Sequence, residues 1–208
     1  MEDTELYIKG KPEHNWEKYY ILKPGDIFVE VGGFIGRYAK IAASRGCSSI
    51  ILVEPSPLNI LALEDFLKRN DIFSDNKIQI TIVKKAVGKE KGKSKFVTFG
   101  EFTSHKLKIY DEAYPYKAED ITDVEVDIAE NIFSELRIDK IDLLAADCEG
   151  CENDLVRGLG HYLDNKVIKH LAIAIYHARD NHRIVSDVLL SKGYKDIKHE
   201  DGIIYASA

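Results

Sequence analysis

The sequence predicts one α/β domain over residues 1–208, built on an open, doubly wound and mostly parallel sheet that ends in an antiparallel hairpin. Short apolar runs of strand length alternate with segments in which apolar residues recur at helical spacing. Several of these runs end at a glycine, a carboxylate or an imidazole, as parallel strands do where they carry a ligand site. A chain of 208 residues is long enough to bury a full hydrophobic core in one domain.

The first half of the chain follows a strand–helix order. Residues 1–24 are polar and aromatic and are expected to form a helical N-terminal segment. A strand at 27–31 then enters a glycine turn, and a helix is expected from Ile35 because the apolar residues that follow fall on one face. A strand at 50–53 precedes a Ser-Pro pair at 56–57, which begins a helix with a hydroxyl cap and a first-turn proline.

The middle of the chain is expected to carry an insertion at 88–127, after a third strand at 78–83. Lysines are dense where the insertion begins, and an extra strand at 96–99 is expected to pair with 124–126. The stretch 100–122 shows no period, and a structureless stretch of that length in a compact domain is typically a lid or binding loop. The insertion is therefore predicted to be a hairpin with a lid loop.

The second half returns to the strand–helix order. A helix is expected at 128–136, and continuous apolar runs predict buried parallel strands at 141–146 and 171–176. A helix and then a hairpin that turns near Gly202 close the chain. Right-handed crossovers place the carboxyl ends of all parallel strands at one edge of the sheet, so side chains at those ends are expected to converge. The residues at or next to these ends are Glu30, Gly32, Glu54, Asp147 and His177.

Composition argues against several classes of protein. The formal net charge of -6 disfavours a partner made of nucleic acid. No apolar stretch is long enough to span a bilayer, and the first residues lack the order of a signal peptide. Three cysteines do not predict a disulfide framework, so the cytoplasm is the expected location. Cys148 and Cys151 are expected to be small, partly buried side chains, in preference to a redox pair or zinc ligands.

The glycine turn and the acidic strand ends indicate a nucleoside ligand. Gly32, Gly33 and Gly36 leave room for backbone to approach a ligand, and Glu54 is placed to accept hydrogen bonds from a ribose diol. The turn lacks the three-glycine dinucleotide pattern, and an aromatic residue inside it would crowd a pyrophosphate. S-adenosylmethionine has no phosphate, and its positive charges favour a carboxylate such as Glu30. The sequence thus favours this cofactor; the alternative is that the glycines only make a tight turn with close helix packing.

A second motif, at 147–152, reads Asp-Cys-Glu-Gly-Cys-Glu and gathers carboxylates around a strand-to-helix turn. With this motif the chain resembles the FkbM family of S-adenosylmethionine-dependent methyltransferases. The other matching segments are 29–36, 53–59, 85–88 and 141–144. The Asp-x-Glu-Gly-x-Glu element is the more specific part of a likeness that covers roughly residues 25–177.

The resemblance implies a seven-stranded class I methyltransferase sheet with a Rossmann-like arrangement, and methyl transfer that usually goes to a hydroxyl oxygen. Glu30, Gly32 and Gly36 are implied to line the methionine end of the cofactor site. Glu54 is implied to hold the ribose, and Ala86 to lie near the adenine.

The chain departs from the family pattern in two places. The family commonly has Asp where Glu30 stands, and Ala-Asn where Gly33 and Phe34 stand. The exchange at Glu30 keeps the charge, so cofactor binding is expected to persist. The family also commonly has Lys where Ala145 stands, which bears on the acceptor site.

Methyl transfer to a hydroxyl needs alignment of the reactants and removal of the hydroxyl proton. The candidate bases are Asp147, His177 and Glu149, and Asp147 is also expected beside the cofactor. The competing interpretations are that His177 caps a strand and bonds to backbone, and that Glu149 and Glu152 only stabilise a helix start. Clustered carboxylates also suit Mg²⁺ or Ca²⁺, but no metal is expected on the sequence alone.

The sequence therefore predicts a cytoplasmic S-adenosylmethionine-dependent methyltransferase that acts on a hydroxyl of a small molecule or glycan. An RNA methyltransferase that uses the lysines at 84–95 is one alternative, although a solvated turn explains such a run more simply. A non-catalytic module that binds the cofactor is the other. The identity of the acceptor and the oligomeric state are left open.

Overall fold

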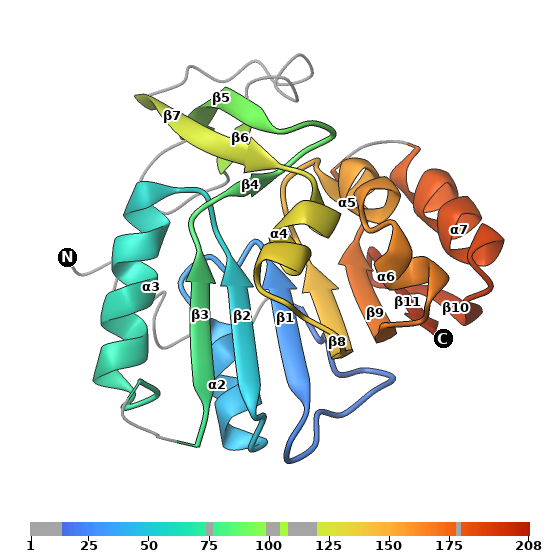
Figure 1. Cartoon of the computed structure of the whole chain (residues 1–208), viewed down its shortest axis with the longest axis horizontal. Helices are drawn as coiled ribbons and strands as arrows, with labels where there is room; N and C mark the ends of the chain where they lie inside the picture. Colours follow the sequence, from blue (N-terminus) through green and yellow to red (C-terminus); the bar gives the residue numbers. More distant parts are fainter. Residues whose placement is uncertain (1–13, 74–76, 99–104, 108–119, 178–179) are drawn as a thin grey trace.

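A computed structural model describes residues 14–73, 77–98, 105–107, 120–177 and 180–208 (Figure 1). Its main sheet has seven strands in the order β10-β11-β9-β8-β1-β2-β3. The strands are β1 (Ile27–Val31), β2 (Ser49–Val53), β3 (Gln79–Val83), β8 (Ile141–Ala146), β9 (Ile168–Ala174), β10 (Lys195–Glu200) and β11 (Ile203–Ser207). Strands β3, β2, β1, β8 and β9 are parallel, whereas β11 runs antiparallel to β9 and pairs with β10. The predicted mostly parallel sheet with a terminal hairpin is confirmed.

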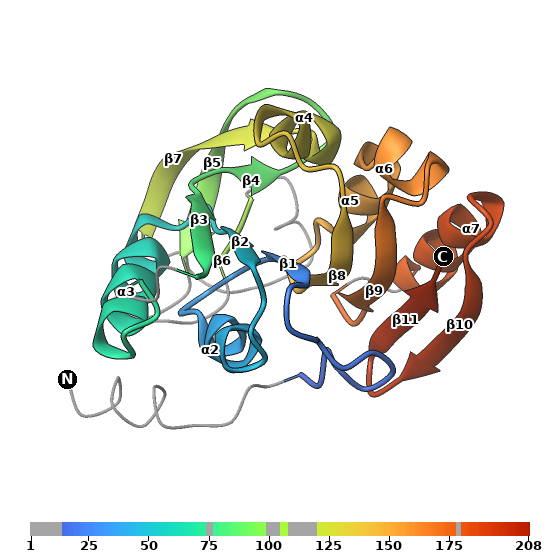
Figure 2. The same ribbon diagram turned by 60° about the horizontal axis from the view of Figure 1, so that its bottom comes forward.

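Helices cover both faces of this sheet (Figures 1 and 2). The first pair, α2 (Arg37–Ser44) and α3 (Pro57–Arg69), packs on one face, and the others pack on the opposite face. These others are α4 (Ala129–Glu135), α5 (Glu152–Gly158), α6 (His161–Asp164) and α7 (Asn181–Ser191). The hydroxyl of Ser56 accepts a hydrogen bond from the backbone N–H of Asn59, so the predicted cap of α3 is confirmed. None of the helices among the described residues could cross a membrane.

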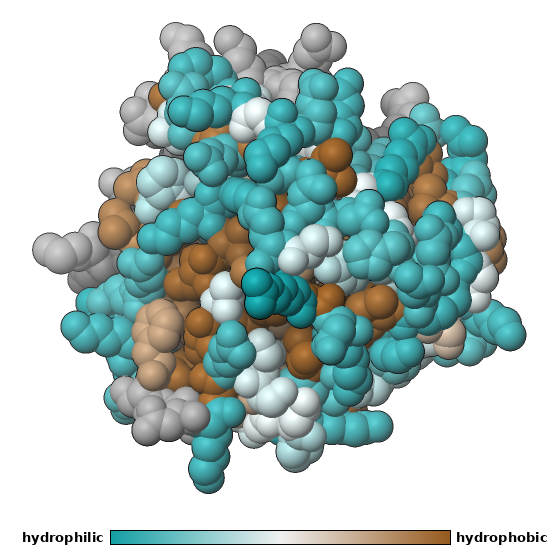
Figure 3. Space-filling view, viewed as in Figure 1, coloured by the Kyte–Doolittle hydropathy of each residue, from teal (hydrophilic) through white to brown (hydrophobic). Residues whose placement is uncertain are grey.

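In the central strands, alternate residues belong to separate hydrophobic cores on the two faces of the sheet, as the pleat of a strand requires. Strand β8 is the most enclosed, with its six residues all buried, because it lies between β1 and β9 and under helices on both sides. At the sheet edge, β3 is only half-buried along most of its length. In Figure 3, apolar side chains show on the viewed face over β2 and β3, beside α4.

The N-terminal segment differs from the prediction. Residues 14–24 form turns, bends and irregular chain without a helix, and residues 1–13 lie outside the described part. The backbone is held by tertiary contacts instead: the N–H of Glu17 donates to the Tyr38 hydroxyl, and the indole N–H of Trp16 donates to Glu30. These contacts dock the segment on the same face as α2 and bring it to the carboxyl end of β1.

The insertion forms a small second sheet of β4 (Ala86–Val87), β5 (Gly92–Thr98), β6 (His105–Leu107) and β7 (Asp120–Asp127). The order is β4-β7-β5-β6. The extra strand pairs with the segment around Val124 as expected, but it begins earlier than predicted, and 124–126 lie opposite 92–94 and not opposite 96–99. Figure 1 shows this sheet beyond the carboxyl ends of the main parallel strands. The predicted lid loop falls largely on 99–104 and 108–119, which are outside the described residues.

Candidate active site

The turn after β1 lies against the turn after β8. Gly32 has a φ of 88°, and a Cβ there would sit 1.8 Å from the backbone oxygen of Asp147. Gly36, with a φ of 81°, faces Leu63 of α3, whose Cδ1 would be 2.5 Å from an added Cβ. Both positions therefore need glycine for the packing of the chain itself. The tight-turn interpretation explains these two glycines, and the close approach it permits brings the ends of β1 and β8 together.

A pocket opens at this junction, and Glu30 is its most unusual wall residue. The lining residues are His14, Trp16, Glu30, Gly32, Gly33, Phe34, Ile35, Arg37, Tyr38 and Asp147. Glu30 is 7 % exposed; its Oε1 accepts a 3.0 Å hydrogen bond from the Trp16 indole, while Oε2 has no hydrogen-bond partner among the described residues. Burial raises the pKa of Glu30 to about 8, against the opposing effect of the Trp16 hydrogen bond. A cation beside this carboxylate would stabilise its charged form.

Glu54, directly after β2, makes three hydrogen bonds within the protein, and its predicted role in holding a ribose remains a prediction. Its Oε2 accepts the backbone N–H of Phe34 at 2.9 Å, and its Oε1 accepts the backbone N–H of Ser56 at 2.9 Å and the side-chain amide of Asn59 at 3.3 Å. Burial raises its pKa to about 7. Glu54 thus ties the glycine turn to the start of α3. A carboxylate has about four acceptor positions, so these three bonds leave capacity for a ribose hydroxyl.

Only some of the predicted cofactor residues line this pocket. Glu30, Gly32, Gly33 and Asp147 line the pocket, whereas Gly36, Glu54 and Ala86 are not among its described lining residues. Ala86 belongs to β4 and packs in the core of the small sheet with Phe96, Val124 and Val126. Its expected place near an adenine remains a prediction.

Asp147 joins the pocket to a second cluster of polar groups. Its Oδ2 accepts a 2.7 Å hydrogen bond from the Tyr176 hydroxyl and lies 2.7 Å from Nε2 of His14. Burial alone would raise the pKa of Asp147, but the His14 hydrogen bond, the charge of His177 and the Tyr176 hydroxyl together lower it. The carboxylate is therefore the form favoured at neutral pH.

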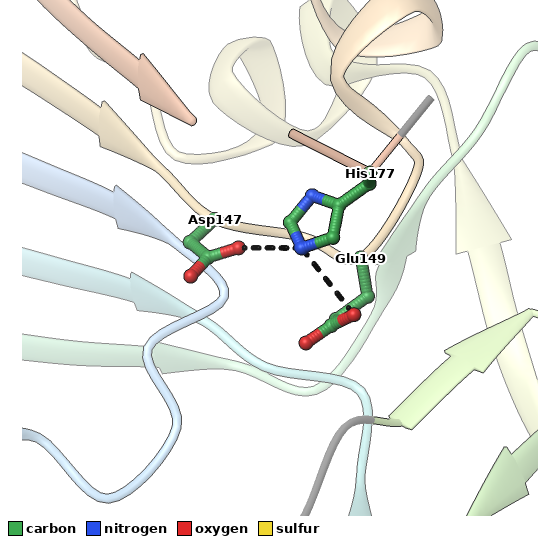
Figure 4. Close-up of side chains that lie close together, drawn as sticks. All are labelled: Asp147, Glu149 and His177. Carbon is green, nitrogen blue, oxygen red and sulfur yellow. Dashed lines mark ion pairs between the residues drawn. The ribbon is translucent and has the colours of Figure 1, made fainter. Parts of the chain in front are cut away.

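His177 lies in the loop after β9 and points back toward the turn after β8 (Figure 4). Its Nδ1 is 2.8 Å from Oε1 of Glu152, and its Nε2 is 3.3 Å from both Oδ1 of Asp147 and Oε2 of Glu149. Burial would lower the pKa of His177, but the hydrogen bond to Glu152 and the three carboxylate charges raise it. The predicted bases Asp147, Glu149 and His177 thus converge, and the hydrogen-bond partner of the imidazole is a carboxylate.

Glu152 is the main residue of the cluster that the sequence interpretation undervalued. It begins α5, is fully buried, and accepts hydrogen bonds from the side chain of Asn181 at 3.0 Å and from the backbone N–H of Gly150 at 3.2 Å. Glu149 precedes the helix and has a φ of 55°, an uncommon left-handed conformation for a non-glycine residue. A role in stabilising the helix start therefore suits Glu152, whose carboxylate accepts backbone N–H groups of the turn before α5.

Three further residues of the site come from segments without a motif. His14 and Trp16 belong to the N-terminal segment, and Tyr176 follows β9. Only Trp16 carried a signal in the sequence, since it is the single tryptophan of the chain.

The sequence analysis expected small, partly buried cysteines in the second motif and no bond between them. Cys148 and Cys151 form a disulfide across the turn, with their Cα atoms 5.4 Å apart. The turn between β8 and α5 folds back tightly enough to bring the pair within the range that a disulfide needs. Cys47 is separate, buried and free, and burial raises its pKa to about 12.

Four of the six lysines at 84–95 lie beside carboxylates. Lys85 contacts Asp127 and Glu135 at 3.3 and 2.6 Å, and Lys91 contacts the same two side chains at longer distances. Lys84 and Lys95 likewise pair with Glu64 and Asp123. These contacts favour the solvated-turn interpretation over a basic surface for nucleic acid.

Comparison with solved structures places this architecture among known folds. The FkbM methyltransferase from Methylobacillus flagellatus KT aligns with a TM-score of 0.66 and 17% identity over 98% of this chain and 50% of that chain. The ribosomal protein L11 methylase from Lactobacillus delbrueckii subsp. bulgaricus aligns with a TM-score of 0.50 and 14% identity over 92% and 72% of the two chains. TrmK of M. capricolum, solved with S-adenosyl-homocysteine, aligns with a TM-score of 0.51 and 9% identity over 90% and 64%.

At these identities the likeness concerns the fold, and this chain spans about half the length of the FkbM methyltransferase that it matches. No protein-family model and no curated protein sequence matches the chain. The seven-stranded, mostly parallel sheet with its antiparallel end and flanking helices is the fold of class I S-adenosylmethionine-dependent methyltransferases.

Proposed function

We propose that this chain is an S-adenosylmethionine-dependent methyltransferase that methylates a hydroxyl oxygen of a small molecule or glycan. The observation that carries the proposal is the state of Glu30: a buried carboxylate on the pocket wall with one oxygen unbonded among the described residues. A buried carboxylate without a partner is costly, and a positive ligand group relieves that cost. The ammonium group of this cofactor meets that need.

The residues at the ends of β1 and β2 fit the cofactor. When bound, S-adenosylmethionine supplies an electrophilic methyl group on a positively charged sulfur. Glu30 would hold its ammonium group and Glu54 its ribose, while Gly32 and Gly33 contribute pocket wall without side chains. A dinucleotide fits less well, because its pyrophosphate would meet carboxylates at both strand ends and the Phe34 side chain in the turn.

The second cluster supplies what an acceptor hydroxyl needs. Asp147 borders both the pocket and the cluster, so an acceptor bound there lies next to the cofactor. The proton of the hydroxyl would pass to Asp147 or to Nε2 of His177, and Glu152 holds the imidazole in place. A positioned base of this kind contributes about 10²–10⁴-fold to a rate.

The proposal is tested by binding and by transfer. Calorimetry with S-adenosylmethionine and, separately, with NAD should show binding of the first only. A mass-spectrometric screen of labelled methyl transfer into small molecules, glycans and RNA should place the label on a hydroxyl of one of the first two. Label confined to RNA would contradict the acceptor class, and cofactor binding without transfer to any acceptor would favour a non-catalytic module.

A further inference from the structure

Three electron-pair donors converge beside the pocket. One ligand atom each of Asp147, Glu149 and His177 lies within 4.8 Å of the other two. Nε2 of His177 is 3.3 Å from Oδ1 of Asp147 and from Oε2 of Glu149. They come from two different connections, the turn after β8 and the loop after β9, and Figure 4 shows the three side chains pointing toward one another. The folding of the chain, and not a single sequence motif, therefore brings this donor set together.

The buried carboxylate of Glu152 determines which nitrogen of the imidazole faces the cluster. Glu152 lies 2.8 Å from Nδ1 of His177, and a carboxylate can only accept, so Nδ1 carries a proton. Its other oxygen accepts from Asn181, and the side chain is fully buried, which holds the pair in one orientation. In the neutral ring, Nε2 then presents a lone pair to Asp147 and Glu149.

This arrangement leaves acceptors facing acceptors. The side chain of His177 is 9% exposed, and neither its Nε2 nor Oδ1 of Asp147 has a hydrogen-bond partner in the part of the chain that the structure describes. The other oxygen of Asp147 is bonded to the Tyr176 hydroxyl, so Oδ1 is the one directed at the imidazole. Three acceptors at such short range repel one another unless a cation lies between them.

We propose that Asp147, Glu149 and His177 bind a divalent first-row transition-metal ion of the Mn²⁺ to Zn²⁺ series. One imidazole with two carboxylates suits these ions, whereas Mg²⁺ and Ca²⁺ prefer oxygen ligands alone. A metal-binding histidine almost always donates its other ring N–H to a carboxylate or carbonyl, and Glu152 is that carboxylate here. The metal alternative weighed in the sequence analysis rested on clustered carboxylates. The structure adds the 3.3 Å approach of Nε2 of His177 to two of them and the buried partner of its Nδ1.

The catalytic meaning of the ion rests on the proposed function, although its binding does not. A metal ion held there would lower the pKa of an acceptor hydroxyl that ligates it, and the hydroxyl would then release its proton to solvent more readily. Because Asp147 also lines the pocket, that oxygen would be held next to the cofactor. Asp147, Glu149 and His177 would then act as ligands, and Glu152 as a positioning residue.

The test uses the full chain after dialysis against a chelator. Mn²⁺ is titrated with detection of free ion by electron paramagnetic resonance, and Zn²⁺ is titrated by calorimetry, each with and without S-adenosyl-homocysteine. We expect about one ion per chain, with His177→Ala and Glu149→Gln each weakening binding at least tenfold. Glu152→Gln should weaken metal binding about 10–100-fold. Its amide N–H can donate to Nδ1, which moves the ring proton of the imidazole to Nε2 and removes the lone pair that would bind the ion.

A matched control is available in His161→Ala, which removes an exposed histidine that pairs with Glu130 outside the site. Metal binding should persist in this variant, and circular dichroism should show that every variant is folded; if His177→Ala does not fold, the half-buried Glu149→Gln decides. Absence of Mn²⁺ and Zn²⁺ binding in the wild type, or full binding in the folded cluster variants, would overturn the inference and leave a proton as the cation. Loss of binding in His161→Ala would also overturn it, by locating the ion elsewhere.

The two proposals fail separately. S-adenosyl-homocysteine binding by the metal-free protein tests the cofactor pocket alone. Cofactor binding without metal binding would overturn only the metal site, and metal binding without cofactor binding would overturn only the proposed function.

Discussion

The indole N–H of Trp16 donates a 3.0 Å hydrogen bond to Oε1 of Glu30, across a sequence separation of 14 residues. This bond ties the N-terminal segment to the end of β1 and leaves Oε2 of Glu30 as the open side of the carboxylate. Trp16 is 3% exposed and lines the same pocket. A ligand that binds Glu30 must therefore change the surroundings of the indole.

Because Trp16 is the chain's only tryptophan, its fluorescence should report on the pocket directly. We expect titration with S-adenosylmethionine to change the intensity or wavelength of tryptophan emission, with a midpoint equal to the calorimetric Kd. Free N-acetyl-tryptophanamide, titrated in parallel, corrects for light absorbed by the adenine. Unchanged emission at cofactor concentrations that saturate the protein by calorimetry would place the cofactor away from Trp16.

The raised pKa of Glu30, about 8, predicts a pH dependence of stability. A carboxyl with a pKa raised by folding contributes stability below its ordinary pKa, near 4.5, and loses it as the pH rises through about 8. The Gln side chain in Glu30→Gln stays neutral at every pH. The free energy of unfolding of this variant, relative to that of the wild type, should therefore rise by up to a few kcal/mol (about 1.4 per pKa unit) between pH 5 and pH 9. Thermal melts of the cofactor-free proteins across this range measure the difference. A gap that stays constant with pH would show that Glu30 is not perturbed.

The disulfide predicts the thiol count of the protein. Denatured without reductant, each chain should react with a thiol reagent at Cys47 alone, and after reduction at three cysteines. Cys47→Ser should then leave no reactive thiol before reduction. Three thiols in the unreduced, denatured wild type would contradict the Cys148–Cys151 bond.

The cluster variants predict a loss of turnover once an acceptor is known. His177→Ala and Asp147→Asn, made separately, should lower kcat by about 10²–10⁴-fold in at least one case. The loss is expected whether these groups take the proton or hold an ion that lowers the pKa of the acceptor hydroxyl. His161→Ala should behave as the wild type. Full activity in both cluster variants would remove them from the chemistry.

Much of the fold follows from sequence because its strands are strongly marked. The predicted bounds of β1 and β8 agree with the structure, since these strands are continuous apolar runs in the middle of the sheet. The prediction of an N-terminal helix was wrong because Trp16 and Glu17 are held by tertiary contacts, which cannot be inferred from the local sequence pattern. Strand β9 begins earlier than predicted, at Ile168, because pairing with β8 and β11 extends it across His170, a residue outside the apolar run.

The candidate site divides in the same way. Glu30, Asp147 and His177 were predicted because strand ends of a parallel sheet converge, a rule that depends on topology alone. The hydrogen bond between His177 and Glu152 was not predicted, because it depends on how the loop after β9 turns back toward α5. The disulfide was likewise missed, since the closeness of Cys148 and Cys151 depends on the left-handed backbone at Glu149 and Gly150 between them.

The pairing of Glu30 with the ammonium group of S-adenosylmethionine is tested most directly by calorimetry with two ligands and three proteins. The ligands are S-adenosylmethionine and methylthioadenosine, which lacks the amino-acid part. The proteins are the wild type, Glu30→Gln and Asp26→Asn, the last a buried carboxylate at the opposite end of β1. We predict that Glu30→Gln weakens the binding of S-adenosylmethionine at least tenfold and changes the binding of methylthioadenosine little. Asp26→Asn should weaken the binding of neither ligand. Equal affinity of the wild type and Glu30→Gln for S-adenosylmethionine would contradict the assignment.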